Sequence, residues 1–349
     1  MNKLSQQGFT LIELMISLTL GLILVAVAIQ LIISGQMNYR IQNAAAAVQD
    51  SGVFGLNAVT KSIRLANHGN AGAMNDETLY GGVVLSAQTT GGAGGSTPDG
   101  NLKGLKQGST LIAGDNYISK NAQNDSAVTT YPKSDQLVIV YQAPENMMTC
   151  TGRNIKGSSR DFITHADGSI ELVLKRGWYV VERYYIKKRT DGDGADLYCS
   201  DALFTAKGEP SNQTYTVGTT TTTIAAPEIV NANYGSNNGE MIAQNVEYLR
   251  VQLMVRNNDN TTAVIAIDDY LASAVDNDTA TVIPAHRPAI TGIKLGMLTR
   301  SNEKVSNVKD ATTYQVLDQS LSAPSDKYMR HVYTTAIALR NGGLGDIIQ

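Results

Sequence analysis

The chain has 349 residues, a formal net charge of −3 and a charged fraction of 17%. That length is sufficient for a sizeable core. The charge balance argues against a nucleic-acid footprint over the whole protein, so no direct nucleic-acid binding is predicted. The densest basic run, Lys187-Lys188-Arg189, is expected to be the solvated end of a strand.

The N-terminal region contains a long uncharged segment. No charged residue lies between Glu13 and Arg40, and the most apolar part is Leu14 to Ile33. A helix over that part is about 30 Å long, enough to cross the hydrocarbon core of a bilayer. The amino terminus and Lys3 precede the segment, which favours a cytoplasmic N-terminus and export of the following chain.

Three interpretations compete for this segment. A cleaved secretory signal is suggested by Ala26-Val27-Ala28, but the apolar run continues to Ile33, where a cleaved signal turns polar. The second interpretation is an uncleaved signal anchor on a periplasmic protein. Neither explains the short polar leader that ends in Gly8, or the lone carboxylate of Glu13 at the edge of the apolar run. A carboxylate there is costly unless it is paired, so Glu13 is a functional candidate.

The string Gly8-Phe9-Thr10-Leu11-Ile12-Glu13 resembles the class III signal of type IV prepilins and type II secretion pseudopilins. The resemblance implies that prepilin peptidase removes residues 1–8 by cleaving between Gly8 and Phe9, and that the new Phe9 amine is methylated. It also implies that Glu13 meets the Phe9 amine of a neighbouring subunit. Locally, Thr10 to Glu13 fits a capping box at a helix start, which is compatible with that role.

Beyond the apolar run, apolar and small residues recur at steps of three or four. This spacing predicts one amphipathic stripe of a continuous helix. The helix is expected from about residue 10 to 67, about 85 Å long, within an N-terminal segment 9–68 whose membrane-crossing part is about 14–33. Asn67 to Asn70 supplies the stop signal. The stripe consists of Ile41, Ala44 or Ala45, Val48, Gly52, Leu56, Val59, Ile63 and Ala66.

Residues 69–349 are expected to form an exported, β-rich globular domain. Strands are predicted at 135–142, 169–175, 178–187, 246–256, 290–299 and 329–340, with a flexible Gly-rich loop at about 81–104. Turn sequences at 191–194 and 257–260 predict hairpins. In the strand 246–256, Leu249 and Val251 alternate with Arg250 and Gln252, which predicts one buried and one solvated face. The expected fold class is α+β, a long N-terminal helix packed on an antiparallel sheet.

The order of several short stretches resembles the PilW family of minor pilins over most of the chain. These are Phe9 to Glu13, Ser134 to Leu137, Tyr184 to Ile186, Leu197 to Cys199, Asn245 to Val251 and Tyr333 to Asn341. The resemblance implies a minor-pilin complex that primes pilus assembly and sits at the tip. Its implied partners are other minor pilins, the major pilin, the inner-membrane assembly platform, prepilin peptidase and a large tip adhesin. The chain would be a single-pass inner-membrane protein before assembly and part of the surface pilus afterwards.

Two other functions remain open at this point. A pseudopilin of the GspJ type would serve a secretion machine instead, although this chain looks too long for one. A membrane-anchored periplasmic binding protein or enzyme is the other. Neither a nucleophile elbow, an HExxH motif nor a dinucleotide fingerprint occurs in the sequence, and no enzymatic activity or cofactor is predicted.

Cys150 and Cys199 form an even pair, which in an exported chain predicts a disulfide, the alternative being two buried thiols. No metal site is predicted. The histidines are scattered without the spacing of metal ligands; they are His68, His165, His286 and His331. The acidic turns carry oxygens that could attract calcium, but their composition is that of ordinary turns. Their acidic residues are Asp191, Asp193, Asp196, Asp268, Asp269, Asp276 and Asp278.

Overall fold

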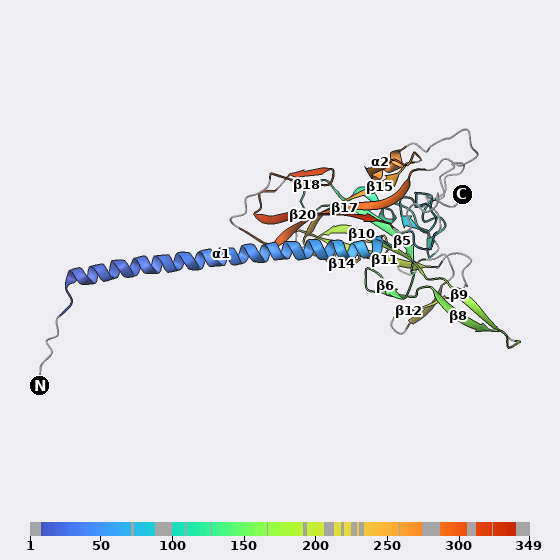
Figure 1. Ribbon diagram of the computed structural model, residues 1–349, viewed down its shortest axis with the longest axis horizontal. Helices are drawn as coiled ribbons and strands as arrows, with labels where there is room; N and C mark the ends of the chain where they lie inside the picture. Colours follow the sequence, from blue (N-terminus) through green and yellow to red (C-terminus); the bar gives the residue numbers. More distant parts are fainter. Residues whose placement is uncertain are drawn as a thin grey trace.

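In the computed structural model, one long helix leaves a compact β-rich body (Figure 1). Helix α1 (Leu11–Ile63) has 53 residues, and its second half lies against the body. The structure describes residues 8–70, 73–87, 100–108, 110–126, 128–165, 167–190, 194–205, 213–217, 220–224, 229, 234–257, 259–273, 287–305, 312–322 and 324–339. The core of the predicted Gly-rich loop and the turn residues 191–193 lie outside these ranges.

The helix ends earlier than the sequence predicts. It stops at Ile63, and residues 64–69 form turns. The cause is a contact with a distant strand, because the Asn67 N–H donates to the carbonyl of Val140 at 3.1 Å. Asn67 adopts a left-handed φ of 66°, a conformation that asparagine tolerates better than most residues. The predicted stop signal is therefore a turn that joins the helix to the sheet.

The first sheet is antiparallel in its central ladder and has six strands. Its order is β1-β5-β10-β11-β14, with β4 also paired to β5. Val181 in β10 lies opposite Val140 in β5 and Ala202 in β11. The strands are β1 (Gly82–Val83), β4 (Lys120–Asn124), β5 (Ser134–Gln142), β10 (Tyr179–Lys188), β11 (Ala195–Phe204) and β14 (Glu240–Ala243).

A second antiparallel sheet has the order β16-β15-β17-β20. These strands are β15 (Val246–Arg256), β16 (Thr262–Ala266), β17 (Ala289–Lys304) and β20 (Tyr328–Ala338), and the short helix α2 (Ile267–Ala272) follows β16. The α+β architecture is as predicted, and all six predicted strands are present. The strands that flank the turn sequences at 191–194 and 257–260 pair antiparallel, β10 with β11 and β15 with β16, while the turns themselves lie partly outside the described residues. Among the strands of the two sheets, β1, β4, β11, β14 and β16 were not predicted, because they are short or lack a clear alternation.

Smaller two-stranded units surround the two sheets. They are β2 (Lys106–Gln107) with β3 (Thr110–Leu111), β6 (Met147–Met148) with β7 (Asn154–Ile155), β8 (Ser159–Thr164) with β9 (Ile170–Lys175), β12 (Gln213–Val217) with β13 (Thr220–Ile224), and β18 (Thr313–Val316) with β19 (Gln319–Ser322). A 3-10 turn, η1 (Asp115–Tyr117), precedes β4.

The main apolar core is shared by both sheets and the end of α1. It includes Val59 and Ile63 from the helix, Tyr141 from β5, Leu197 from β11 and Leu249 from β15. One core therefore fixes the direction in which α1 leaves the body. Two smaller clusters cover the other faces of the sheets: one around Tyr80 and Phe204, and one around Tyr248 and Leu321.

The predicted solvated face of β15 is buried, so that prediction is wrong. Arg250 and Gln252 are buried although they alternate with the core residues. Strands β18 and β19 pack beyond this face, and Arg250 Nε donates to Asp318 Oδ1 at 2.8 Å in the turn between them. The Arg250 guanidinium also lies 3.3 Å from Asp135 of β5. Burial raises the pKa of Asp135 to about 6, even though Arg250 opposes that shift. A local polar and apolar alternation cannot reveal that a distant hairpin covers the polar side.

Candidate assembly surface on the N-terminal helix

The start of α1 is capped as the sequence predicts. Thr10 is the N-cap, and its Oγ1 accepts a hydrogen bond from the Glu13 N–H at 3.3 Å. Glu13 lies in the first turn, where the helix dipole favours a carboxylate. Its side chain is exposed, and among the residues that the structure describes no cation pairs with it. The chain thus presents an unpaired carboxylate next to the apolar segment, available to a cation from elsewhere.

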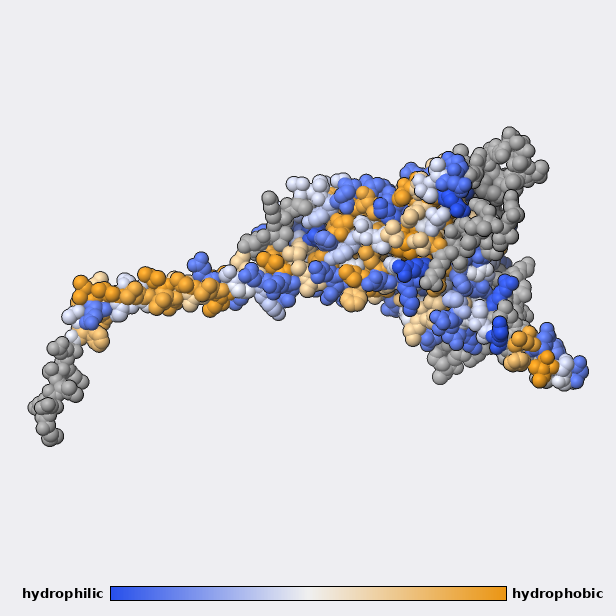
Figure 2. Space-filling view, viewed as in Figure 1, coloured by the Kyte–Doolittle hydropathy of each residue, from blue (hydrophilic) through white to orange (hydrophobic). Residues whose placement is uncertain are grey.

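The first half of α1 is apolar on every side and contacts no other part of the described chain closely. Its most apolar part has no buried residue, which makes α1 the one described helix long and apolar enough to cross a membrane. Figure 2 shows this segment as a mostly hydrophobic rod outside the body. The hydroxyls of Ser17 and Thr19 donate to the carbonyls of Leu14 and Ile16, both at 2.9 Å, so they do not oppose burial in lipid.

The second half of α1 packs on β14, β17 and β20 through small residues. Gly52 faces the ring of Tyr333 so closely that an added Cβ would lie 2.3 Å from its Cδ2 atom. Gly55 faces Ala243 and Met297, where an added Cβ would lie 3.0 Å from the Ala243 Cβ. The predicted stripe is confirmed, since Ala44, Val48, Gly52, Val59, Ile63 and Ala66 are buried, with Ile41 and Leu56 half-buried. Gly55 and Ser62 were missed, because neither is apolar enough to extend the pattern.

We expect Gly52→Ala to lower the free energy of unfolding by roughly 1 kcal/mol. Overpacking against Tyr333 costs about 1–3 kcal/mol, and the better helix propensity of alanine offsets up to about 1 kcal/mol. Urea denaturation of the full chain in detergent, followed by tyrosine fluorescence, would measure the change. The control is Gly35→Ala, because an added Cβ there has nothing within 4 Å. Equal stability of the two variants would contradict this account of the helix docking.

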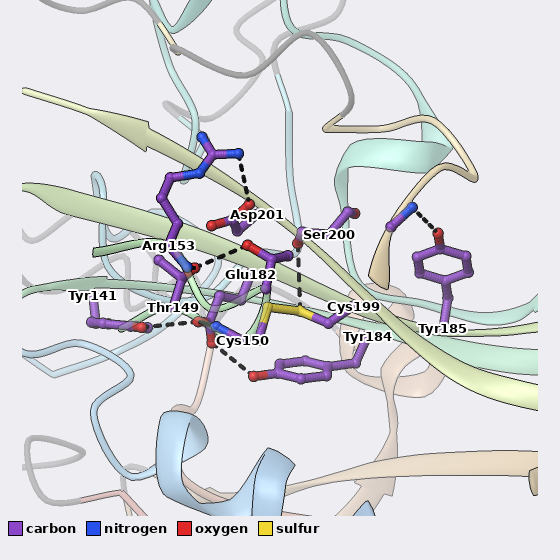
Figure 3. Close-up of a disulfide and its surroundings, with 12 residues drawn as sticks. Tyr141, Thr149, Cys150, Arg153, Glu182, Tyr184, Tyr185, Cys199, Ser200 and Asp201 are labelled. Carbon is purple, nitrogen blue, oxygen red and sulfur yellow. Dashed lines mark hydrogen bonds and ion pairs between the residues drawn. A yellow bond between two sulfur atoms is a disulfide. The ribbon is translucent and has the colours of Figure 1, made fainter. Parts of the chain in front are cut away.

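A buried carboxylate connects the end of α1 to the disulfide (Figure 3). Glu182 in β10 accepts hydrogen bonds from the hydroxyl of Tyr184 at 2.7 Å, the hydroxyl of Tyr141 at 3.0 Å and the N–H of Cys150 at 2.7 Å. Ser62 of α1 also hydrogen-bonds Glu182. Burial raises the pKa of Glu182, although these donors oppose the shift. The sequence contained only one hint of this cluster, a glutamate inside the predicted strand 178–187.

Cys150 and Cys199 are joined by a disulfide, as predicted. The bond ties the β6–β7 hairpin to β11, beside the buried Glu182 and below an ion pair between Arg153 and Asp201 at 3.4 Å (Figure 3). Trp178, just before β10, is buried in the same core. The disulfide therefore has a structural role, because it holds a peripheral hairpin against the central strands.

Replacing both cysteines by serine should lower the free energy of unfolding by roughly 4 kcal/mol, because the disulfide closes a loop with a sequence separation of 49. Chemical denaturation of the oxidised protein would measure this. Wild-type protein treated with reductant is the matched control and should unfold like the variant. An unchanged denaturation midpoint in the variant would contradict the structural role.

Three of the four histidines are described, and each has an ordinary partner. His68 Nδ1 lies 2.7 Å from the Gln142 carbonyl, His165 pairs with Glu171 at 2.9 Å, and His331 contacts the Tyr333 ring. His286, Asp191, Asp193, Asp276 and Asp278 lie outside the described residues. Asp196 accepts a hydrogen bond from Arg189 Nε at 2.8 Å, and Asp268 and Asp269 lie in the first turn of α2. Over the described part of the chain, no cluster of three potential metal ligands occurs.

Comparison with known proteins gives two family matches. Residues 3–29 match the prokaryotic N-terminal methylation motif, and residues 214–341 match the family described as Type IV Pilus-assembly protein W. No curated protein matches the chain. Among solved structures, a type IV-like pilin from Thermus thermophilus is similar at 14% identity, covering 60% of this chain and 78% of that one, with a TM-score of 0.28.

The methylation motif lies at the start of a long, exposed apolar helix, and that helix continues into a β-rich body. Together these features define a type IV pilin-like protein that the helix anchors in a membrane. Residues 214–341, from β12 to β20, match the Type IV Pilus-assembly protein W model, so this part of the chain is similar to the PilW minor pilins.

Proposed function

We propose that this minor pilin takes part in priming type IV pilus assembly, within a minor-pilin complex at the pilus tip. The observation that supports this most strongly is a combination: a methylation motif, a Glu13 that no described residue pairs with, and an apolar helix half without contacts in the described part of its own chain. Such a helix half is suited first to lipid and later to a bundle of similar helices. A structural subunit needs this surface, whereas an enzyme does not.

In the proposed pathway, the chain enters the inner membrane with its N-terminus in the cytoplasm and its β-rich domain in the periplasm. Prepilin peptidase cleaves between Gly8 and Phe9, and the Phe9 amine is methylated. The Glu13 carboxylate then pairs with the Phe9 amine of a neighbouring subunit. Each charge alone in lipid costs several kcal/mol, so pairing between subunits removes both penalties and fixes their register.

The proposed partners follow from that pathway. They are prepilin peptidase and the assembly platform at the inner membrane, then other minor pilins, the major pilin and a large tip adhesin. The pilus would serve twitching motility, adhesion or DNA uptake. After assembly, the subunit would lie in the pilus at the cell surface.

A chimera separates this function from that of an anchored periplasmic enzyme or binding protein. Residues 1–33 are replaced by a cleavable secretory signal, so that the β-rich domain is released into the periplasm. We expect cells with only this chimera to lose surface pili, since the domain cannot join the helix bundle. The wild-type gene on the same plasmid is the control. Normal piliation with the chimera would reject the proposal, and normal piliation with loss of protein secretion would favour a pseudopilin.

A further inference from the structure

The β8–β9 hairpin projects from the end of the molecule opposite the N-terminus of α1 (Figure 1). Its strands pair with each other and, within the described residues, with no other strand. Two-stranded sheets are marginally stable alone and usually gain stability from further strands or from a covered apolar face. The hairpin is therefore an incomplete unit in the isolated chain.

The base of the hairpin is fixed to the body by close backbone contacts. An added Cβ at Gly157 would lie 2.1 Å from the Glu145 backbone, and one at Gly177 would lie 2.0 Å from the Ala143 carbonyl oxygen. The Trp178 N–H donates to the Lys156 carbonyl at 3.0 Å. At the far end, the turn is closed by paired backbone groups of residues 165 and 169. The body thus holds this hairpin in a defined direction.

One face of the hairpin carries large apolar side chains. Phe162 lies opposite Leu172, and Ile170 is two residues from Leu172, so all three share a face. Phe162 and Ile170 are 69% exposed and Leu172 is 53% exposed. Arg160 is two residues before Phe162 and lies on the same face. It is exposed, and no described carboxylate forms an ion pair with it.

We propose that this face, defined by Arg160, Phe162, Ile170 and Leu172, docks a partner protein that lies beyond the subunit at the distal end of the complex. The partner surface would be apolar, with a carboxylate placed to meet Arg160. This inference rests on the proposed function, because the membrane-anchored helix then directs the opposite end away from the inner membrane. A cluster of three large apolar side chains on a projecting element is typical of a contact surface.

A protein suits this face better than a lipid surface does. The opposite side of the hairpin tip carries the His165–Glu171 pair, and Asp167 accepts hydrogen bonds from Ser169 beside it. Insertion into lipid would surround the hairpin and bury these polar groups at a cost. A protein surface covers one side and leaves the other in water.

The test uses the full chain in cells, with a photo-crosslinking amino acid in place of Leu172. We expect an adduct in sheared pili whose partner peptide, mapped by mass spectrometry, comes from another pilus protein and contains apolar and acidic residues. Arg160→Glu should reduce the adduct about tenfold or more, while Arg160→Lys should retain it. Val264 of β16, 46% exposed, is the matched control position and should give no such adduct.

Four outcomes would overturn this inference: no adduct, an adduct with lipid, an adduct within the same chain, or an adduct unaffected by Arg160→Glu. Leader removal and the disulfide are checked in every variant, so that misfolding is separated from lost docking. Failure of the proposed function has a different signature, because the wild-type chain would then be absent from sheared pili. Failure of the docking inference leaves the chain in pili and removes only the adduct.

Discussion

Gly8→Val is expected to leave the leader attached and to keep the chain in the inner membrane. An added Cβ at Gly8 meets nothing within 4 Å, so the substitution causes no clash with the described residues. Any loss must then arise where the peptidase holds the peptide bond between residues 8 and 9, because a branched side chain occupies space that glycine leaves free. Uncleaved chain should account for nearly all of the variant protein.

Electrophoretic size in membrane and sheared-pilus fractions measures this result. The matched control is Gly21→Val, since an added Cβ at Gly21 also meets nothing within 4 Å and that position is far from the cleavage site. The control should be shortened like the wild type. If Gly8→Val were shortened equally, cleavage between Gly8 and Phe9 would be excluded.

Glu13→Gln should reduce incorporation into pili about a hundredfold or more, with the leader still removed. Glutamine keeps the size of the side chain but loses the charge, which leaves the Phe9 amine of the neighbouring subunit without a counter-charge in an apolar bundle. Removing one partner of a buried ion pair costs about 3–5 kcal/mol, and each 1.4 kcal/mol corresponds to about a tenfold change in binding.

Immunoblots of sheared pili against whole cells quantify this incorporation. Thr10→Ala is an informative control, because it removes the Oγ1 atom that caps the helix at the Glu13 N–H but leaves the carboxylate. It should weaken the first turn by about 1 kcal/mol and affect incorporation much less. Wild-type levels of the Glu13→Gln variant in pili would contradict a role for the charge.

The parts of this molecule that sequence predicted best are those with local causes. The apolar run and the three-to-four spacing of Val48, Gly52 and Val59 predict α1 and its docked face, because both depend only on helix geometry. The helix end was misplaced by four residues, since the Asn67 bond to Val140 depends on a strand far along the chain. Arg250 was placed in solvent for the same reason, because β18 and β19 cover it from a distant part of the sequence.

The polar link between Ser62, Glu182 and the Cys150 backbone also depends on contacts between distant parts of the sequence. Its members come from α1, β10 and the β6–β7 hairpin, so no spacing in the sequence brings them together. The sequence could predict that Cys150 and Cys199 bond to each other, because two cysteines allow one connectivity. What that bond holds in place, a peripheral hairpin beside a buried carboxylate, required the fold.

The most direct test of this protein as a processed pilus subunit is the intact mass of the wild-type chain recovered from sheared pili. We predict a chain that begins at Phe9, carries one methyl group on its amine and contains the Cys150–Cys199 disulfide. A chain in pili that still begins at Met1, or a chain confined to the inner membrane while pili form normally, would contradict it.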